Sequence, residues 1–172
     1  MVRILVIGSG AREHAIVKAL SQSKRAKKIY CLASNHNPGL INICEDIKID
    51  NINDPDLVKN YAKKHEIDFA IIGPENPLFN GVADALWDIE VGTIGPKKNL
   101  AQIETSKSFM RNLLKEYKIP GCPKYKTFKD IDGVEEFLSL LGEDYVVKYD
   151  GLAGGKGVKV SGDHLHSHKE AI

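Results

Sequence analysis

Apolar residues in the first 95 positions form short runs that alternate with segments of helical spacing. A nearly continuous apolar run that ends in glycine, such as VRILVIG, is typical of a parallel strand covered on both faces. The runs that predict strands are residues 2–8, 27–34, 46–49, 68–75 and 92–96. Segments 12–20 and 81–89 predict helices, and Asp54 before Pro55 predicts the start of another. This alternation predicts α/β architecture: a doubly wound, Rossmann-like parallel sheet.

The pattern changes near residue 100. Helices are predicted at 109–117 and 133–141, and strands at 125–128, 144–151 and 157–161. The last two strands are joined directly by a glycine-rich loop, which favours an antiparallel hairpin. We therefore predict two domains, residues 1–100 and 101–172, and the last residues, HLHSHKEAI, look like the start of an element that stops.

Composition excludes several classes of protein. The 172 residues, 42% hydrophobic and 27% charged, are enough to bury a core. A formal net charge of +1 gives no bulk field for nucleic acid or an acidic membrane, so neither partner is expected. The three cysteines lack C-x-x-C spacing and indicate neither a disulfide framework nor a zinc site. The N-terminal apolar run is too short for a signal peptide or a membrane span, and we expect a cytoplasmic protein.

The stretch GSGAREHA, which begins at Gly8, ends the first predicted strand and opens the first predicted helix. Such a turn directs backbone N–H groups and the positive helix end toward an anion, and Arg12 in the first helical turn suits a phosphate. The stretch departs from a dinucleotide fingerprint, because Glu13 replaces the third glycine, which leaves close helix–strand packing unprovided for, and residues 33–34 offer no acid to a ribose. A phosphate site for a smaller ligand is favoured over NAD or a structural turn. His14 by itself is more typical of packing.

Two further predicted strands end in Gly-Pro, at Gly73-Pro74 and at Gly95-Pro96. In a parallel sheet these turns lie at the same edge as the first loop. Glycine permits close approach of a ligand, and proline fixes the turn. Gly95-Pro96 alone favours a structural turn, whereas the charged Glu75 on a strand-end loop favours a functional role.

The stretch YDGLAGGKGV holds four glycines between Gly151 and Gly157 and one lysine. It is no P-loop, because Asp150 stands where that motif has its first glycine and Gly157 stands where it has serine or threonine. The loop predicts a flap that closes over phosphates, with a mobile surface hairpin as the alternative. Lys107 and Lys148 are further phosphate candidates, although a lone lysine is more often a solvated surface charge.

These stretches carry a family resemblance. VIGSGAREHA, IIGPENPLFNGVAD, IGP, SKSFMRNLL and YVVKYDGLAGGKGV occur in an order and spacing that closely resemble the N-terminal part of the phosphoribosylamine–glycine ligase (glycinamide ribonucleotide synthetase) family, ATP-grasp enzymes of purine biosynthesis. The resemblance covers essentially the whole chain. The sequence departs from the family pattern at Ala11, Tyr149 and Gly154, none of which replaces a charged group, and segment 35–39 is poorly matched.

The resemblance implies a function and a role for each motif. The family joins glycine to 5-phosphoribosylamine to give glycinamide ribonucleotide, ADP and phosphate; ATP first phosphorylates the glycine carboxylate, and the amine then attacks the acyl phosphate. The positions near phosphoribosylamine would be Gly8, Gly10, Arg12, Glu13, His14, Gly73, Pro74 and Glu75. The positions that contact ATP would be Lys107, Lys148, Asp150, Gly151, Leu152, Ala153, Gly154, Gly155, Lys156 and Gly157.

The resemblance also implies that residues 101–172 are the incomplete beginning of an ATP-grasp domain and that parts of the family enzyme lie beyond these residues. The adenine-binding hinge, the Mg²⁺ or Mn²⁺ ligands, the catalytic residues and the C-terminal domain follow later in the family, so we expect no metal ligand here. His164, His166 and His168 are expected to be a solvated segment rather than a metal site. We therefore expect no ligase activity from these 172 residues alone, with the missing C-terminal half as a partner.

Two other interpretations stay open beside this one. Another ATP-grasp carboxylate ligase, such as a carboxyaminoimidazole ribonucleotide synthetase or a biotin carboxylase, would share the architecture, although REHA and GPENPL argue against it. A non-catalytic nucleotide- or phosphate-binding module would keep the ligand sites without the chemistry.

Overall fold

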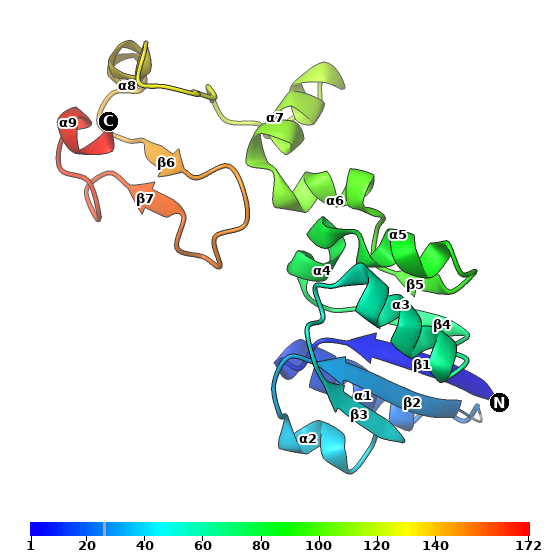
Figure 1. Ribbon diagram of the computed structural model, residues 1–172. Helices are drawn as coiled ribbons and strands as arrows, with labels where there is room; N and C mark the ends of the chain where they lie inside the picture. The colour runs from blue at the N-terminus through cyan, green and yellow to red at the C-terminus, as the bar shows by residue number, and fades with distance from the viewer. Residues whose placement is uncertain (26) are drawn as a thin grey trace. The chain divides into compact units, whose positions relative to one another are not determined.

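The computed structural model describes residues 1–25 and 27–172 (Figure 1). The chain divides into two compact units, Met1–Ala101 and Gln102–Ile172, each of which is described by itself below. In the described part of the chain, no helix has the length and apolar character needed to cross a membrane.

The N-terminal unit is built on one parallel sheet. Its strands are β1 (Val2–Ile7), β2 (Lys27–Ala33), β3 (Asp46–Ile49), β4 (Phe69–Ile72) and β5 (Gly92–Ile94). Its helices are α1 (Ala11–Ser21), α2 (Pro38–Ile41), α3 (Pro55–Lys64), α4 (Glu75–Asn80), α5 (Val82–Trp87) and the start of α6 (Lys98–Thr105). The strand order β3-β2-β1-β4-β5 places β1 at the centre. The chain adds β2 and β3 on one side of β1 and then β4 and β5 on the other side. The predicted doubly wound sheet is confirmed.

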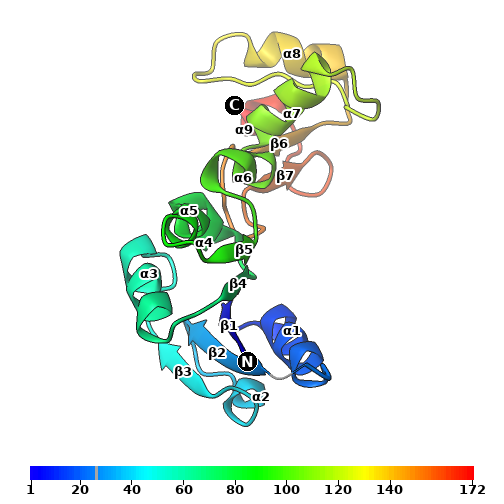
Figure 2. The ribbon, with the colours of Figure 1, turned by 90° about the vertical axis from the view of Figure 1, so that its right-hand side faces the viewer.

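Apolar side chains cover both faces of this sheet, as the continuous apolar runs predicted. On one face, Leu5 and Leu32 pack with Val58 of α3 and Leu86 of α5. On the other face, β1 and β2 pack against α1 and α2, through a cluster that includes the fully buried Val17. Figure 2 shows α1 on one side of the strands and α3 on the other. The two layers hold the carboxyl ends of β1, β4 and β5 at one edge.

Helix α3 shows how local sequence sets an element. The Asp54 carboxylate accepts hydrogen bonds from the amides of Asp56 and Leu57, at 2.9 and 3.1 Å, and Pro55 occupies the first turn. These are the preferred N-cap and first-turn residues of a helix. Val58 and Tyr61 fall on the buried face of α3. The predicted start of this helix is confirmed.

The C-terminal unit combines helices with a hairpin. It contains the end of α6, then α7 (Lys107–Glu116), α8 (Val134–Leu141), β6 (Val146–Lys148), β7 (Val158–Val160) and α9 (His168–Ala171). Strands β6 and β7 pair antiparallel, as predicted, and the segment between them forms a wide loop (Figure 1). A small core of Leu138, Tyr145 and Leu165 supports the hairpin.

Some predictions of secondary structure were wrong. Residues 125–128 form no strand; side-chain contacts hold this segment instead, with the Tyr125 hydroxyl donating to Asn112 at 2.8 Å and the Phe128 ring 6.0 Å from that of Phe137. The helices α2, α4, α6 and α9 were not predicted. As a result, Glu75 opens a helix and does not lie on a loop.

Candidate functional site

The first glycine loop joins β1 to α1 at the carboxyl edge of the sheet. Gly8 has a φ of +120°, and its N–H donates to the Leu32 carbonyl at 2.9 Å. Gly10 is the N-cap residue of α1 and has no side chain with which to accept from the first-turn amides. The start of α1 therefore keeps the anion-binding character that the sequence indicated.

The Glu13 side chain is buried behind this loop, only 3% of the residue being exposed. Its Oε2 accepts a hydrogen bond from the Gly10 N–H at 2.6 Å, while its Oε1 has no hydrogen-bond partner among residues 1–25 and 27–172. A Cβ atom at Gly73 would lie 2.1 Å from Oε1, and one at Gly8 would lie 2.8 Å from the Glu13 Cδ. The glycines of two strand-end loops thus make room for this carboxylate. The expectation that Glu13 prevents close packing of the helix on the strands was wrong. Gly73, which lacks a side chain, leaves the space that the Glu13 side chain occupies.

Arg12 and Glu75 bring the same two loops together on the outside. The Arg12 guanidinium lies 3.7 Å from the Glu75 carboxylate, and the two side chains are 72% and 38% exposed. Pro74 is the N-cap residue of α4, which places Glu75 in the first helical turn. The pair is an open, solvated charge pair at the carboxyl ends of β1 and β4, so Arg12 can turn to an anionic ligand at little cost.

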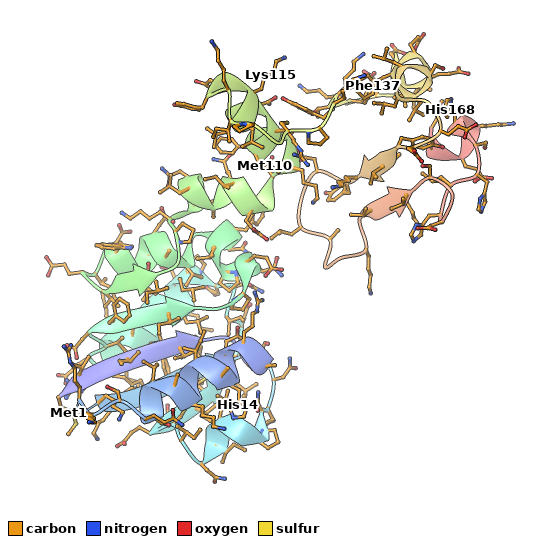
Figure 3. The ribbon with its side chains drawn as sticks, turned by 180° about the vertical axis from the view of Figure 1, so that it is seen from behind. Met1, His14, Met110, Lys115, Phe137 and His168 are labelled. Atoms are coloured by element: carbon orange, nitrogen blue, oxygen red, sulfur yellow. The ribbon has the colours of Figure 1, made fainter. Side chains whose placement is uncertain are left out.

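His14 packs on the neighbouring α2. A Cβ atom at Gly39 would lie 2.4 Å from the His14 ring, and the residue is labelled in Figure 3. Asn37 caps α2 by accepting from the Gly39 N–H at 3.0 Å, and its amide donates to the Ser9 carbonyl at 2.9 Å. Segment 35–39, which sequence reasoning left without a role, therefore supports the first loop. The Asn-Pro pair before Gly39, an N-cap followed by a first-turn proline, was the available signal.

The end of β2 bears on the dinucleotide alternative. Ser34 follows β2, and its hydroxyl lies 3.2 Å from that of Ser9. The sheet edge therefore presents hydroxyl groups where a dinucleotide site would place an acid for the ribose. Gly95, at the end of β5, has a φ of +135° and accepts a hydrogen bond from Thr93 at 2.9 Å, which is consistent with a structural turn.

The second glycine loop belongs to the C-terminal unit and spans residues 149–157 between β6 and β7. The Tyr149 N–H donates to the Gly157 carbonyl at 2.8 Å, which closes the base of the loop. Gly154 and Gly155 both have positive φ, and a Cβ atom at either would meet nothing within 4 Å. With Lys156, they are exposed. The tip of the loop is therefore bare backbone with one ammonium group.

Residues at the start of α7 are bonded to the base of this loop. The Lys107 ammonium donates to the Gly151 carbonyl at 2.8 Å. The Asp150 carboxylate accepts from the Ser106 hydroxyl at 3.2 Å, from the Ser108 N–H at 3.1 Å, and from the Ser108 hydroxyl. Burial opposes ionisation of Asp150, but hydrogen bonds from Ser108, Lys107 and Ser106 outweigh it and hold the pKa of this carboxyl below its usual range. Lys148 is exposed near the end of β6.

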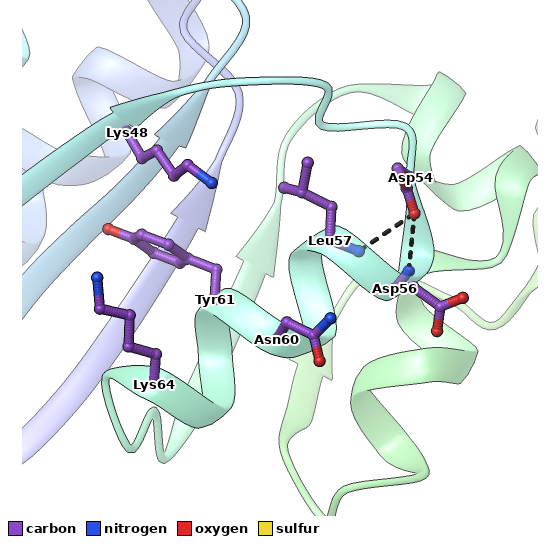
Figure 4. Close-up of a pocket in the computed structure, with 7 residues that line it drawn as sticks. All are labelled: Lys48, Asp54, Asp56, Leu57, Asn60, Tyr61 and Lys64. Carbon is purple, nitrogen blue, oxygen red and sulfur yellow. Dashed lines mark hydrogen bonds between the residues drawn. The ribbon is translucent and has the colours of Figure 1, made fainter.

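Two cavities among residues 1–25 and 27–172 are lined by none of the predicted site residues. One, of about 500 Å³, lies between β3 and α3 (Figure 4) and is lined by Lys48, Asp54, Asp56, Leu57, Asn60, Tyr61 and Lys64. The other, of about 480 Å³, includes His166 and His168 in the C-terminal unit. Among the described residues, no group of three or more His, Cys, Asp or Glu side chains could hold a metal ion. His164 and His166 are exposed, while His168 lies edge-on to Tyr145 with 5.3 Å between ring centroids.

Comparison with solved structures identifies the fold. The phosphoribosylamine–glycine ligase of Thermotoga maritima is similar with a TM-score of 0.74 at 24% identity, covering 98% of this chain and 37% of that one. The N5-carboxyaminoimidazole ribonucleotide synthetase of the same organism has a TM-score of 0.72 at 18% identity, covering 100% of this chain and 44% of that one. The fold is that of enzymes with a Rossmann-like domain followed by an ATP-grasp domain.

Sequence comparison narrows the class to one family. Residues 2–104 match the N domain of phosphoribosylglycinamide synthetase, and residues 105–172 match its ATP-grasp (A) domain. The phosphoribosylamine–glycine ligase of Methanosarcina barkeri is 45% identical over 169 residues, covering 98% of this chain and 39% of the relative. The chain belongs to the phosphoribosylglycinamide synthetase family. It spans about two fifths of the length of the curated relatives that it matches.

Proposed function

We propose that this sequence forms the N-terminal part of a cytoplasmic ligase that joins glycine to phosphoribosylamine with ATP. The observation that carries the proposal is the succession of the two domains of one synthetase along residues 2–172. Each domain contributes a glycine-rich loop. The loop of the N-terminal unit suits a ribose phosphate, and that of the C-terminal unit suits a nucleoside triphosphate. The whole reaction also needs the remainder of the family chain.

The N-terminal unit supplies a site for the phosphate of phosphoribosylamine. The first turn of α1 and the open Arg12–Glu75 pair provide N–H donors and a guanidinium at one sheet edge. Glu13, buried behind the loops, shapes this edge through its close contacts with Gly8, Gly10 and Gly73. When the Arg12 guanidinium turns from Glu75 to a phosphate, the Glu75 carboxylate accepts hydrogen bonds from the ribose hydroxyls or the amine.

The C-terminal unit supplies part of a site for ATP. Lys107, Lys148 and the amides of residues 151–157 provide positive charge and N–H donors to phosphate oxygens. ATP transfers a phosphoryl group to the glycine carboxylate, which gives an acyl phosphate and ADP. Phosphate is a far better leaving group than the oxygen of a free carboxylate. Such a transfer depends on positioning and charge stabilisation more than on a covalent catalyst. Because the described residues contain no group of three or more His, Cys, Asp or Glu side chains that could hold the Mg²⁺ or Mn²⁺ that the family implies, we assign that ion no ligand here.

Sequence rather than fold favours this ligase over its structural neighbours. The two synthetases of Thermotoga maritima have nearly equal TM-scores, 0.74 and 0.72, so the fold does not separate a glycine ligase from a carboxyaminoimidazole synthetase. By contrast, the 45% identity to the Methanosarcina barkeri relative extends over nearly the whole chain. The acceptor substrate is therefore the property that most needs a test.

The test uses a completed chain, defined here as residues 1–172 followed by the corresponding remainder of the Methanosarcina barkeri relative. With freshly generated phosphoribosylamine, we expect ADP formation that requires glycine. ADP formation that requires bicarbonate or no carboxylate would contradict the proposal. Arg12→Ala should weaken binding of a ribose 5-phosphate ligand by about 1.5–3 kcal/mol, the usual range for a hydrogen bond to a charged group. An unchanged titration would place the phosphate elsewhere.

A further inference from the structure

An aspartate inside a phosphate-binding loop is unfavourable unless its charge is turned away from the phosphates. Asp150 stands at the base of the second glycine loop, two residues after Lys148. Its carboxylate is engaged by Ser106 and Ser108, which flank Lys107 at the start of α7. Two hydroxyls and backbone N–H groups disperse its negative charge, as is typical of a carboxylate at a helix N-terminus.

The same short segment makes a second link to the loop. Between the two serines, the Lys107 ammonium donates to the Gly151 carbonyl at 2.8 Å. Asp150 and Gly151 are consecutive, so side chains of residues 106–108 hold one carboxylate and the next carbonyl together. The contacts join positions 42 and 44 residues apart in sequence. A carbonyl oxygen and a phosphate oxygen are both acceptors for an ammonium group, so the Gly151 carbonyl occupies a coordination position that a phosphate can take over.

We propose that Asp150 is a positioning residue that contacts no nucleotide. This inference rests on the proposed function. Its carboxylate fixes the base of the glycine loop on the first turn of α7, which holds the Lys107 ammonium at the loop before ATP binds. Lys107 then exchanges the Gly151 carbonyl for a phosphate oxygen, and the same exchange releases the loop to close. Asp150 thereby acts on ATP through Lys107.

Steady-state kinetics of the completed chain tests the proposal. Asp150→Ala should raise the KM for ATP by about 10- to 100-fold, as expected for the loss of charge-assisted hydrogen bonds, and leave the KM for glycine within about twofold. Ser108→Ala removes one hydroxyl and should raise the KM for ATP by about 3- to 10-fold. Ser108→Thr keeps a hydroxyl and should have the wild-type KM for ATP. Asp163→Asn, at an exposed turn after β7, is the matched control and should change neither constant.

A double-mutant cycle separates positioning from simple stability. If Asp150 acts through Lys107, Asp150→Ala should add less than about twofold to the KM for ATP in a Lys107→Ala background. Trypsin cleavage after the exposed Lys156, without nucleotide, should be faster in Asp150→Ala than in the wild type, because the base of the loop is released.

The outcomes distinguish this inference from the function on which it rests. A wild-type completed chain without glycine-dependent ADP formation overturns both. An active wild type whose KM for ATP is unchanged by Asp150→Ala, or whose Asp150 and Lys107 effects multiply independently, overturns the positioning role alone. If Asp150→Ala does not fold, the comparison of Ser108→Ala with Ser108→Thr decides: equal KM values for ATP reject the proposal, and loss in alanine with recovery in threonine supports it.

Discussion

The crowding around the buried Glu13 carboxylate predicts that Gly73→Ala is severely destabilising. An added Cβ would lie 2.1 Å from Oε1 and 2.6 Å from Cδ of Glu13, so the carboxylate must move. Overpacking costs about 1–3 kcal/mol, and loss of the 2.6 Å hydrogen bond from Gly10 N–H to this charged group costs about 1.5–3 kcal/mol. Since the carboxylate keeps part of that bond as it shifts, we expect Gly73→Ala to lower the free energy of unfolding by about 2–5 kcal/mol.

A double-mutant cycle gives this prediction its sharpest form. The three atoms closest to the added Cβ all belong to Glu13. In a Glu13→Ala background they are absent, so Gly73→Ala should then cost less than about 1 kcal/mol. Gly92→Ala is the matched control, because its nearest neighbour would be a Phe69 ring atom at an ordinary 3.8 Å.

Urea unfolding measures these effects in the N-terminal unit. The chain has one tryptophan, Trp87 in α5, so its fluorescence reports on the N-terminal unit. The midpoint should shift in Gly73→Ala without a large change in slope. Equal destabilisation by Gly73→Ala with and without Glu13 would refute the reasoning, since the two residues would then not be in contact.

Two further predictions concern α3. Burial, and after it the 2.7 Å hydrogen bond to Asp46, raises the pKa of Tyr61 above its ordinary value of 10.0. The raised pKa means that stability from the neutral phenol is complete below pH 10 and is lost as the pH rises above it. In alkaline urea titrations, the stability gap between wild type and Tyr61→Phe should therefore narrow above pH 10, whereas Tyr117→Phe, at an exposed tyrosine, should show no such trend; a constant gap would contradict the assignment. Asp54→Ala should cost about 1 kcal/mol by removing the α3 N-cap, and Asp54→Asn only a few tenths, as measured by the same unfolding assay; equal costs would argue against capping.

The sheet could be predicted from sequence because burial on both faces leaves a local record. Continuous apolar runs such as VRILVIG can be read without knowledge of the partner strand. The same reasoning failed at 125–128, where aromatic residues and threonine resemble a strand. Tyr125 instead donates a hydrogen bond to Asn112 of α7, and the Phe128 ring packs near that of Phe137 in α8. Strand propensity indicates a side chain that packs well, and packing does not require a ladder.

The candidate sites could be located from sequence but not assembled. Glycines in strand-end loops marked both places correctly as bare backbone. Yet the missing side chain of Gly73 makes room for Glu13, a residue 60 positions earlier, and the Asp150 carboxylate bonds to Ser108 in α7, 42 positions earlier. Neither contact leaves a periodic signal, because each depends on how distant segments meet in the folded chain. The contact of Asn37 with Ser9, 28 positions away, was missed for the same reason, although Asn37-Pro38 is a local signal for a helix start.

The central place of β1 has a consequence for synthesis on the ribosome. VRILVI is made first, but it pairs with β2 and with β4, and the sheet is complete only after β5 ends at Ile94. At 5–20 residues per second, β1 waits roughly 3–13 s from its own completion at Ile7 until its second neighbour, β4, is complete at Ile72. During that interval the nascent chain presents an uncovered apolar segment, and it is the most natural place for a chaperone to bind.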